Sequence, residues 1–219
     1  MLARPGRAAG RRHKVAAWSD ERLLEAARAD EPGAFDAFVA RYGGRLFAFG
    51  MRMCGHREDA EDVFQETLLK AFTGLAGLRE PKAIRTWLFR VASNQCLMKR
   101  RAEKSDPTQG ISLEQLKPSG WEEGQPVEVP DWSDLPEDGA RRSELRAALE
   151  KAIFNLPPDY KETVILRDIE GLTTKETADV LGVRTPTIKM RLHRARMALR
   201  DRLARFHVDY DGNHARETP

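Results

Sequence analysis

Residues 171–202 constrain the fold of this chain more than any other stretch, because their pattern predicts a short helix over 174–181 and a second helix, joined by a sharp turn. Thr174 is placed to cap the first helix, and Gly182 follows it where the turn requires a positive φ. Thr185 is placed to cap a second helix that opens at Pro186, a residue favoured in the first turn. The stretch therefore predicts a helix-turn-helix.

The second helix of this motif has one apolar face and one face rich in cations. Winding it at about 100° per residue gives an apolar stripe of Ile188, Leu192, Ala195, Leu199 and Leu203. The other side carries Pro186, Thr187, Met190, His193, Arg194 and Met197, flanked by Lys189, Arg191, Arg196 and Arg200. A helix that docks on its own domain and enters the DNA major groove needs this layout. The alternative interpretation is a solvated basic helix inside an ordinary bundle.

Charge is distributed unevenly along the 219 residues, although the formal net charge is only +3. Five Lys and Arg and no acid occupy residues 1–18, which we expect to be disordered. Nine acids and one lysine occupy residues 105–139, where frequent Pro and Gly predict an extended linker. Residues 140–206 hold fifteen Lys and Arg against nine acids, which favours a nucleic-acid partner for that block.

Several classes of protein are disfavoured by the sequence. The chain has no apolar run of about eighteen residues and no secretory signal, so we expect a cytoplasmic protein without a membrane span. Cys54 and Cys96, the only cysteines, lack metal-ligand spacing, and we interpret them as buried thiols. The sequence also lacks a nucleophile motif and a phosphate-binding glycine loop, so we predict no catalytic residue, cofactor, metal or small-molecule substrate.

Residues 19–104 show helical periodicity and no strand pattern, so the predicted fold class is all-α. We expect helices that begin at Ser19, continue after Pro32-Gly33, start again at Glu58-Asp59, and run over residues 83–101. The first should carry Ala27 on its apolar side, and the last should carry Met98 on its apolar side and Phe89 on the other. Beyond the linker we expect helices over residues 142–155 and, after Pro157-Pro158, over 159–168. In the third helix, an apolar stripe ending at Phe72 lies opposite an acidic and amide face. The residues of that face are Asp59, Glu61, Asp62, Gln65 and Glu66.

Four segments in order resemble the extracytoplasmic-function (ECF, group 4) sigma factors of bacterial RNA polymerase. They read DAEDVFQETLLKAF (59–72), RTWLFRVASN (85–94), LPPDYKETVILRDIEGL (156–172) and VRTPTIKMRLHRAR (183–196). The resemblance implies two small helical domains, over residues 19–104 and 140–206, joined by the linker and followed by a tail over 207–219. It also implies core RNA polymerase, through its beta-prime clamp helices and beta flap, promoter DNA and an anti-sigma factor as partners.

The resemblance assigns roles to particular residues. The acidic face of the third helix is implied to bind core polymerase. Residues implied to bind and open the −10 element are Leu78, Arg79, Arg85, Phe89, Arg90, Asn94, Lys99 and Arg100. Residues implied to bind the −35 element are Arg184, Thr187, Lys189, Met190, Arg191, His193, Arg194 and Arg196. The linker is implied to thread toward the polymerase active-site and RNA-exit channel.

Two positions depart from the family pattern. Leu78 stands where an aromatic residue is common, and Pro186 stands where glycine or another small residue is common. A different class of function also fits a helix-turn-helix, namely a one-component regulator that binds palindromic duplex DNA as a dimer. The basic and aromatic groups along residues 83–101 disfavour it, because an effector-binding domain does not need them. An enzyme acting on nucleic acid is the least favoured class.

Overall fold

The computed structural model describes residues 18–102 and 139–214, and every regular element within them is helical. The first group of helices is α2 (Asp20–Arg28), α3 (Ala34–Cys54), α4 (Arg57–Gly74), the 3-10 turn η1 (Leu75–Gly77) and α5 (Ala83–Ala102). The second is α6 (Gly139–Phe154), α7 (Pro158–Val164), the π-helical turn η4 (Ile165–Ile169), α8 (Thr174–Leu181) and α9 (Thr185–His214). The predicted all-α class is therefore confirmed.

The chain divides into two compact units, with the main boundary between residues 104 and 105; the short segment Asp179–Gly182 is grouped with the first unit. That boundary lies in the predicted acidic linker, which falls outside the described residues, as do the basic tail and the last residues of the chain. Among the described residues, none of the helices is long and apolar enough to cross a membrane.

Ser19 caps the start of helix α2, as predicted. The Ser19 hydroxyl accepts a hydrogen bond from the Arg22 backbone N–H at 3.2 Å, and two acids stand in the first turn of the helix. Both features satisfy the exposed N–H groups of a helix start. The buried side of the helix consists of Leu23, Leu24 and Ala26. Ala27 was expected on that side and is only half-buried, because the buried arc is centred one residue earlier.

A shared carboxylate joins α2 to α3. The Tyr42 hydroxyl and the Arg41 Nε both donate to Asp20 Oδ1, each at 2.7 Å. Burial, together with the hydrogen bond to Asp20, raises the pKa of the Tyr42 phenol well above its ordinary value. The phenol therefore remains a hydrogen-bond donor at any physiological pH, which fixes α2 against the first half of α3.

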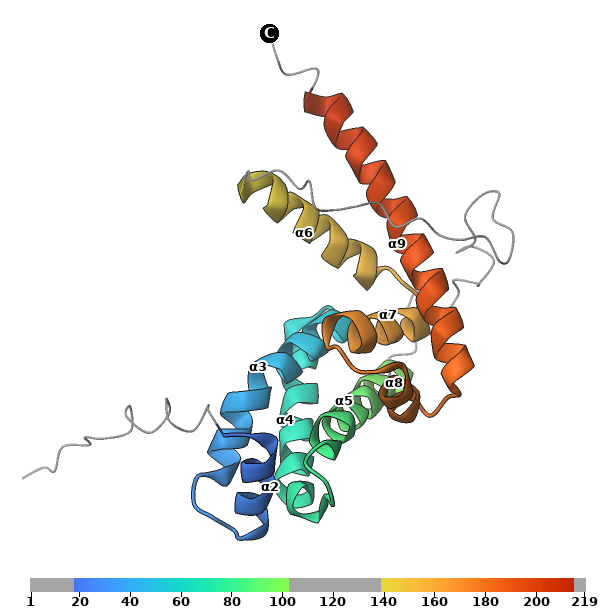
Figure 1. The fold of residues 1–219 in the computed structure, drawn as a ribbon. Helices are drawn as coiled ribbons and strands as arrows, with labels where there is room; N and C mark the ends of the chain where they lie inside the picture. The colour runs from blue at the N-terminus through green and yellow to red at the C-terminus, as the bar shows by residue number, and fades with distance from the viewer. Residues whose placement is uncertain (1–17, 103–138, 215–219) are drawn as a thin grey trace, which may run out of the picture. The chain divides into compact units, whose positions relative to one another are not determined.

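Helices α3, α4 and α5 pack side by side and form the core of the first unit (Figure 1). Helices α3 and α4 approach each other closely at Gly50 and Ala60: a Cβ placed on Gly50 would lie 3.3 Å from the Ala60 carbonyl oxygen. Two small residues at this crossing let the backbones of α3 and α4 nearly touch. Phe49 fills the space beside the crossing and meets the Phe89 ring at 5.4 Å, in a T-shaped arrangement.

Three aromatic or sulfur-containing side chains of this unit lie where the sequence did not place them. Phe89 of α5 was expected at the surface but is 1% exposed, because α5 packs on both α3 and α4 and so buries a wider arc than one stripe. Phe72 and Met98 were expected in the core but are 66% and 60% exposed. At the end of α4 the core position is taken by Leu75 of η1, and Phe72 rests edge-on against Phe35 at 5.2 Å.

The second unit is built around α9, which packs against α6 and α7. Side chains of α7 and η4 form much of its core, with Tyr160, Val164, Ile165 and Leu166 all buried. The helix predicted after Pro157-Pro158 is present, but its last residues widen into the π-helical turn η4, in which the Glu170 N–H donates to the Ile165 carbonyl at 2.8 Å. Farther along, Arg202 of α9 donates to the Ala152 carbonyl of α6 at 2.9 Å.

Two glycines give a matched test of this packing. A Cβ on Gly74 would lie 2.8 Å from Cζ2 of Trp87, whereas one on Gly44 in α3 would meet nothing within 4 Å. We expect Gly74→Ala to destabilise the protein by about 1–3 kcal/mol through overpacking. Gly44→Ala should stabilise it by about 0.5–1 kcal/mol, because alanine favours the helix more than glycine does. Urea unfolding followed by circular dichroism measures both, and equal midpoints would contradict the close contact with Trp87.

Candidate nucleic-acid interface

The first helix of the predicted helix-turn-helix is α8, which occupies the predicted range Thr174–Leu181. Its start is fixed by a reciprocal pair of hydrogen bonds: the Glu176 N–H donates to the Thr173 hydroxyl at 3.2 Å, and the Thr173 N–H donates to the Glu176 carboxylate at 2.7 Å. This arrangement is a capping box. The cap is therefore Thr173, one residue before the predicted Thr174, whose hydroxyl instead accepts from Arg167 at 3.4 Å.

The turn between α8 and α9 is made by Gly182. Its φ is +65°, in the left-handed region that glycine adopts without steric cost. The Val183 N–H donates back to the Ala178 carbonyl at 3.1 Å, the bond expected when a helix ends in a left-handed residue. Helix α9 then begins at Thr185, because the Arg184 carbonyl accepts from the N–H groups of Thr187 and Ile188. The predicted positive φ at Gly182 is confirmed.

The apolar stripe of α9 docks the helix as predicted. Ile188 and Ala195 are fully buried, Leu192 and Leu199 are less than a tenth exposed, and Leu203 is half-buried. On the other side, Met190 is 41% exposed, and Arg184, Lys189 and His193 are also exposed. Thr187 and Arg194 are half-buried. Met197 was expected on the outer face and is buried, because α7 and α6 cover a wide arc of α9.

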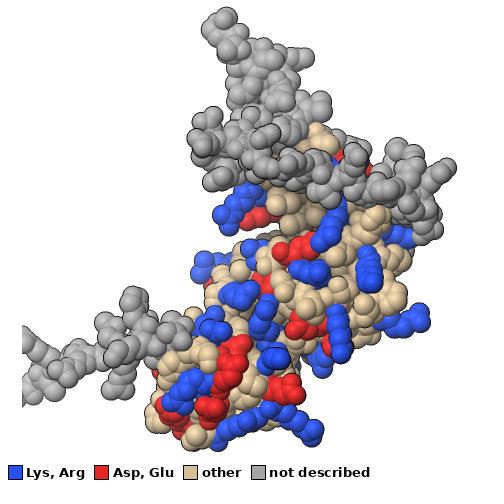
Figure 2. All heavy atoms as spheres, in the orientation of Figure 1, with Lys and Arg blue, Asp and Glu red and all other residues tan. Residues whose placement is uncertain are grey.

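Two arginines predicted to bind the −35 element are held by acids of the same unit. Arg191 pairs with Asp159 at the start of α7, and Arg196 forms two hydrogen bonds to Asp168 at 2.7 and 3.0 Å. The hydrogen bonds to Asp168 raise the pKa of Arg196. Figure 2 shows the mixture of basic and acidic side chains on the surface of the described residues. These pairs orient the two guanidinium groups beside the outer face of α9 and partly neutralise them.

The residues predicted for the −10 element divide between surface and interior. Arg79, Arg90 and Asn94 are exposed, and Arg85 is half-buried. Phe89 is in the core, so it is not available to stack on a base. The side chain of Arg100 lies outside the described residues.

The loop before α5 is held by Arg28, a residue that the sequence did not single out. Its guanidinium donates to the backbone carbonyls of Leu78 and Arg79, at 2.5 and 2.9 Å. Leu78 itself is half-buried. A signal for this role was present, since Arg28 is the one cation in the last turn of α2, where a cation is favoured by the helix dipole. Its target, about fifty residues later in the chain, could not be read from local pattern.

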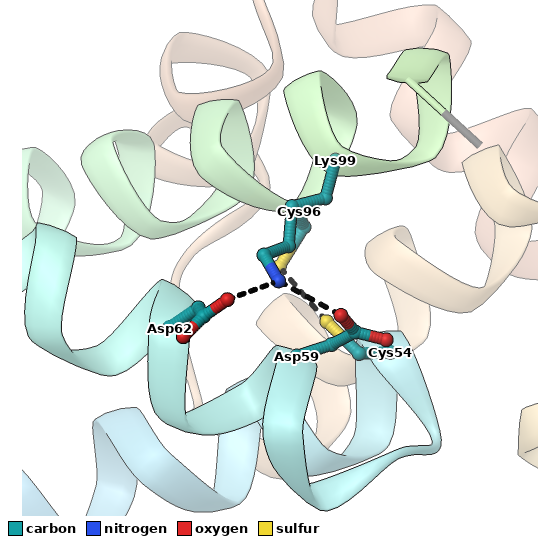
Figure 3. A network of polar contacts seen from close by, with 5 residues as sticks. All are labelled: Cys54, Asp59, Asp62, Cys96 and Lys99. Atoms are coloured by element: carbon teal, nitrogen blue, oxygen red, sulfur yellow. Dashed lines mark hydrogen bonds and ion pairs between the residues drawn. The ribbon is translucent and has the colours of Figure 1, made fainter.

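The predicted polymerase-binding and promoter-binding sets share one cluster, formed by Asp59, Asp62 and Lys99 (Figure 3). The Lys99 ammonium donates to Asp59 at 2.8 Å and to Asp62 at 2.7 Å. Partial burial by itself lowers the pKa of Lys99, but the hydrogen bonds to the two carboxylates outweigh it, and the pKa lies above its ordinary value. Lys99 thus links α5 to the acidic face of α4.

The remaining face of α4 mixes charge with apolar surface. Glu61 pairs with Arg57 at 2.7 Å, whereas Gln65 and Glu66 are exposed. Leu69 and Phe72 lie on the same face of α4 as Gln65 and Glu66, and their side chains are 62% and 66% exposed. The sequence had placed Phe72 in the core and had not singled out Leu69. Exposed apolar side chains beside acids are typical of a protein-binding surface.

Two parts of the chain match known families, in the order of the two units. Residues 22–105 match the family described as Sigma-70 region 2, and residues 146–199 match the family described as Sigma-70, region 4.

Relatives of known sequence agree. The chain is 35% identical over 173 residues to the ECF RNA polymerase sigma factor SigE of Mycolicibacterium smegmatis, covering 78% of this chain and 62% of that protein. It is 30% identical to the ECF RNA polymerase sigma factor SigM of Mycobacterium tuberculosis, covering 83% of each. The chain spans about half to two thirds of some relatives, including 48% of SigG of M. tuberculosis.

Solved structures share the fold. The structure of CnrH in complex with the cytosolic domain of CnrY aligns with a TM-score of 0.57 at 24% identity, covering 84% of this chain and 97% of that one. The sigma factor RpoE of Bartonella quintana, solved with the anti-sigma factor NepR, aligns with a TM-score of 0.55 at 23% identity, covering 78% and 98%. The two family matches, together with the identity to SigM, show that the protein belongs to the sigma-70 family, in its ECF group.

The neighbouring threonines at the start of α8 test which residue caps the helix. Removing the Thr173 hydroxyl leaves the Glu176 N–H without its partner, so Thr173→Ala should cost about 1 kcal/mol of local stability. Amide hydrogen exchange in α8, measured on the full chain, should then accelerate by about fivefold. Thr174→Ala is the matched control and should leave exchange nearly unchanged. Equal acceleration in both variants would contradict the assignment.

Proposed function

We propose that this protein is a promoter-specificity subunit of bacterial RNA polymerase, which binds core polymerase and recognises the −35 and −10 elements. The observation that carries the proposal is the presence, in one chain, of matches to Sigma-70 region 2 and region 4 in that order. The protein acts by binding rather than by catalysing a reaction, and it works in the cytoplasm, where polymerase and promoter DNA are found.

Under this proposal the two units divide the work. Residues 19–104 bind core polymerase and the −10 element, and residues 140–206 bind the −35 element. The geometry of α8 and α9 supports the second assignment, because a docked stripe leaves Lys189, Met190 and His193 exposed on one face. Arg194 is the candidate for a bidentate contact to guanine, while Arg184, Arg191 and Arg196 are suited to phosphates.

The polymerase surface proposed for α4 combines the acids with the apolar residues beside them. Gln65 and Glu66 offer exposed polar groups. Leu69 and Phe72 offer exposed apolar surface that a bound partner would remove from water. A partner helix with basic and apolar side chains fits such a face, as the beta-prime clamp helices would. Because RpoE of B. quintana was solved with an anti-sigma factor, an anti-sigma factor is also proposed as a partner here.

The one-component regulator is not favoured. Such a protein needs a helix-turn-helix and an effector or dimerisation domain, whereas residues 22–105 match Sigma-70 region 2. A sigma factor and a one-component regulator also differ in whether they need another protein in order to bind DNA. A sigma factor selects promoters when it is bound to core polymerase, and a dimeric regulator binds palindromic duplex DNA by itself.

Run-off transcription tests the proposal directly. Purified core polymerase with this protein should produce transcripts that start at discrete sites in a library of promoter fragments, and those sites should share upstream −35 and −10 motifs. Core polymerase alone provides the baseline. Lack of association with core polymerase, together with tight binding of the chain alone to palindromic duplex DNA, would overturn the proposal in favour of the regulator.

Substitutions in α9 and just before it should separate phosphate contacts from base contacts. Arg184→Ala, which removes an exposed cation assigned to a phosphate, should weaken promoter binding for all −35 sequences alike and should lower the slope of log affinity against log salt by about one unit. Arg194→Ala should cost about 1–3 kcal/mol at its preferred base pair and relax the preference there. Lys151→Ala, which removes an exposed cation of α6, is the control. Binding of the holoenzyme to promoter variants, measured over a salt series, distinguishes the three.

Substitutions on α4 should weaken binding to core polymerase without affecting the fold. Leu69→Ser and Glu66→Lys change exposed side chains, so each should lower the affinity for core polymerase by about tenfold or more while the melting temperature stays nearly the same. Glu25→Lys makes the same charge change on α2 and should have little effect. Fluorescence anisotropy with labelled protein measures the affinities. Unchanged affinity in both α4 variants would remove this face from the proposal.

A further inference from the structure

The only two cysteines of the chain lie next to each other in the first unit. Cys54 is the last residue of α3, and Cys96 is in α5, 42 positions later. Their sulfur atoms are 4.0 Å apart (Figure 3). Both are in the thiol form. A disulfide requires about 2.0 Å between the sulfurs, so closing the pair requires a movement of about 2 Å.

The two thiols differ in how far a reagent can reach them. Cys96 is 1% exposed, while Cys54 is only half-buried. Cys54 also stands where α3 ends, directly before Gly55, whose φ is +79°. Helix ends adjust more readily than helix interiors, because their last carbonyls lack partners within the helix. Cys54 can therefore meet an oxidant and also turn toward Cys96.

We propose that Cys54 and Cys96 are a peroxide-reactive dithiol, which forms an intramolecular disulfide that thiol reductants reverse. Hydrogen peroxide first oxidises the accessible Cys54 thiol to a sulfenic acid and is reduced to one water. The Cys96 sulfur then attacks the Cys54 sulfur, the S–S bond forms, and the sulfenic oxygen leaves as a second water. In sum, two thiols lose two electrons and two protons, and one peroxide yields two waters.

The disulfide would join α3 to α5 by a covalent bond within the packed group of α3, α4 and α5. The closed loop contains the whole of α4, Arg57–Gly74, and so both carboxylates that hold Lys99. Lys99 is one helical turn beyond Cys96, on the same side of α5 (Figure 3). Joining the end of α3 to α5 removes conformational freedom from the unfolded chain, so the oxidised form should be more stable than the reduced form. This inference concerns the chemistry of the chain alone and does not rest on the proposed function.

Intact-mass analysis of the full chain tests the proposal. After treatment with hydrogen peroxide, removal of peroxide by catalase, and alkylation in denaturant with N-ethylmaleimide, the monomer should carry no maleimide and weigh about 2 Da less. Dithiothreitol should restore two alkylatable thiols. The melting temperature of the oxidised protein should be several degrees above that of the reduced protein.

Two variants keep the assignment testable. Cys96→Ala removes the buried partner, so peroxide should leave a sulfenic acid on Cys54 that dimedone captures. Cys54→Ser changes the half-buried position, and its Cys96 should keep its thiol under the same treatment. The proposal is overturned if both wild-type thiols remain alkylatable, if they are lost only as sulfinic or sulfonic acids, or if the disulfide forms only between two chains.

Discussion

The near contact of α3 and α4 at Gly50 and Ala60 is the constraint on which the first unit depends. With no side chain on Gly50, the two backbones come close enough for α5 to lie against both helices at once. That double contact is why Phe89 is drawn into the core beside Phe49, although its place in the sequence suggested an exposed ring. It also brings residues about forty positions apart into one cluster, where Cys54 meets Cys96 and Asp59 meets Lys99. A bulkier residue at position 50 would separate these pairs together.

Features set by neighbouring residues could be predicted from the sequence, and features set by distant ones could not. The cap at Ser19, the left-handed Gly182 and the buried stripe of α9 each follow from a local rule about helix ends or periodicity, and each is present. Helix bounds were correct to within a few residues, and the Thr173 cap was missed by one. Helical periodicity wrongly predicted that Phe72 and Met98 would be buried. Both residues lie near the ends of their helices, where fewer neighbouring side chains are present to cover an apolar stripe.

In the candidate interface too, features set by local sequence could be predicted and features set by distant residues could not. Sequence identified the outer face of α9 and the acidic face of α4 from spacing alone. It could not show that Arg191 and Arg196 are held by acids of α7 and η4, or that Lys99 belongs to the face of α4. A cation already paired gives up part of its attraction to any other anion, yet its pairing also fixes where it points. The charge available to a ligand is therefore less than a count of Lys and Arg suggests, and it is better oriented.

Helix α9 continues for 30 residues without a break, well beyond the few that face outward at its start. At 1.5 Å per residue it is a rod of about 45 Å, and it resists twisting because each turn is bonded to the next. Its rotation about its own axis is set by the stripe from Ile188 to Leu199 and, farther along, by the bond from Arg202 to the Ala152 carbonyl. Which side chains the tip presents is thus decided partly by residues several turns away. Substitutions several turns away from the tip can therefore change which side chains the tip exposes, without altering any residue of the tip itself.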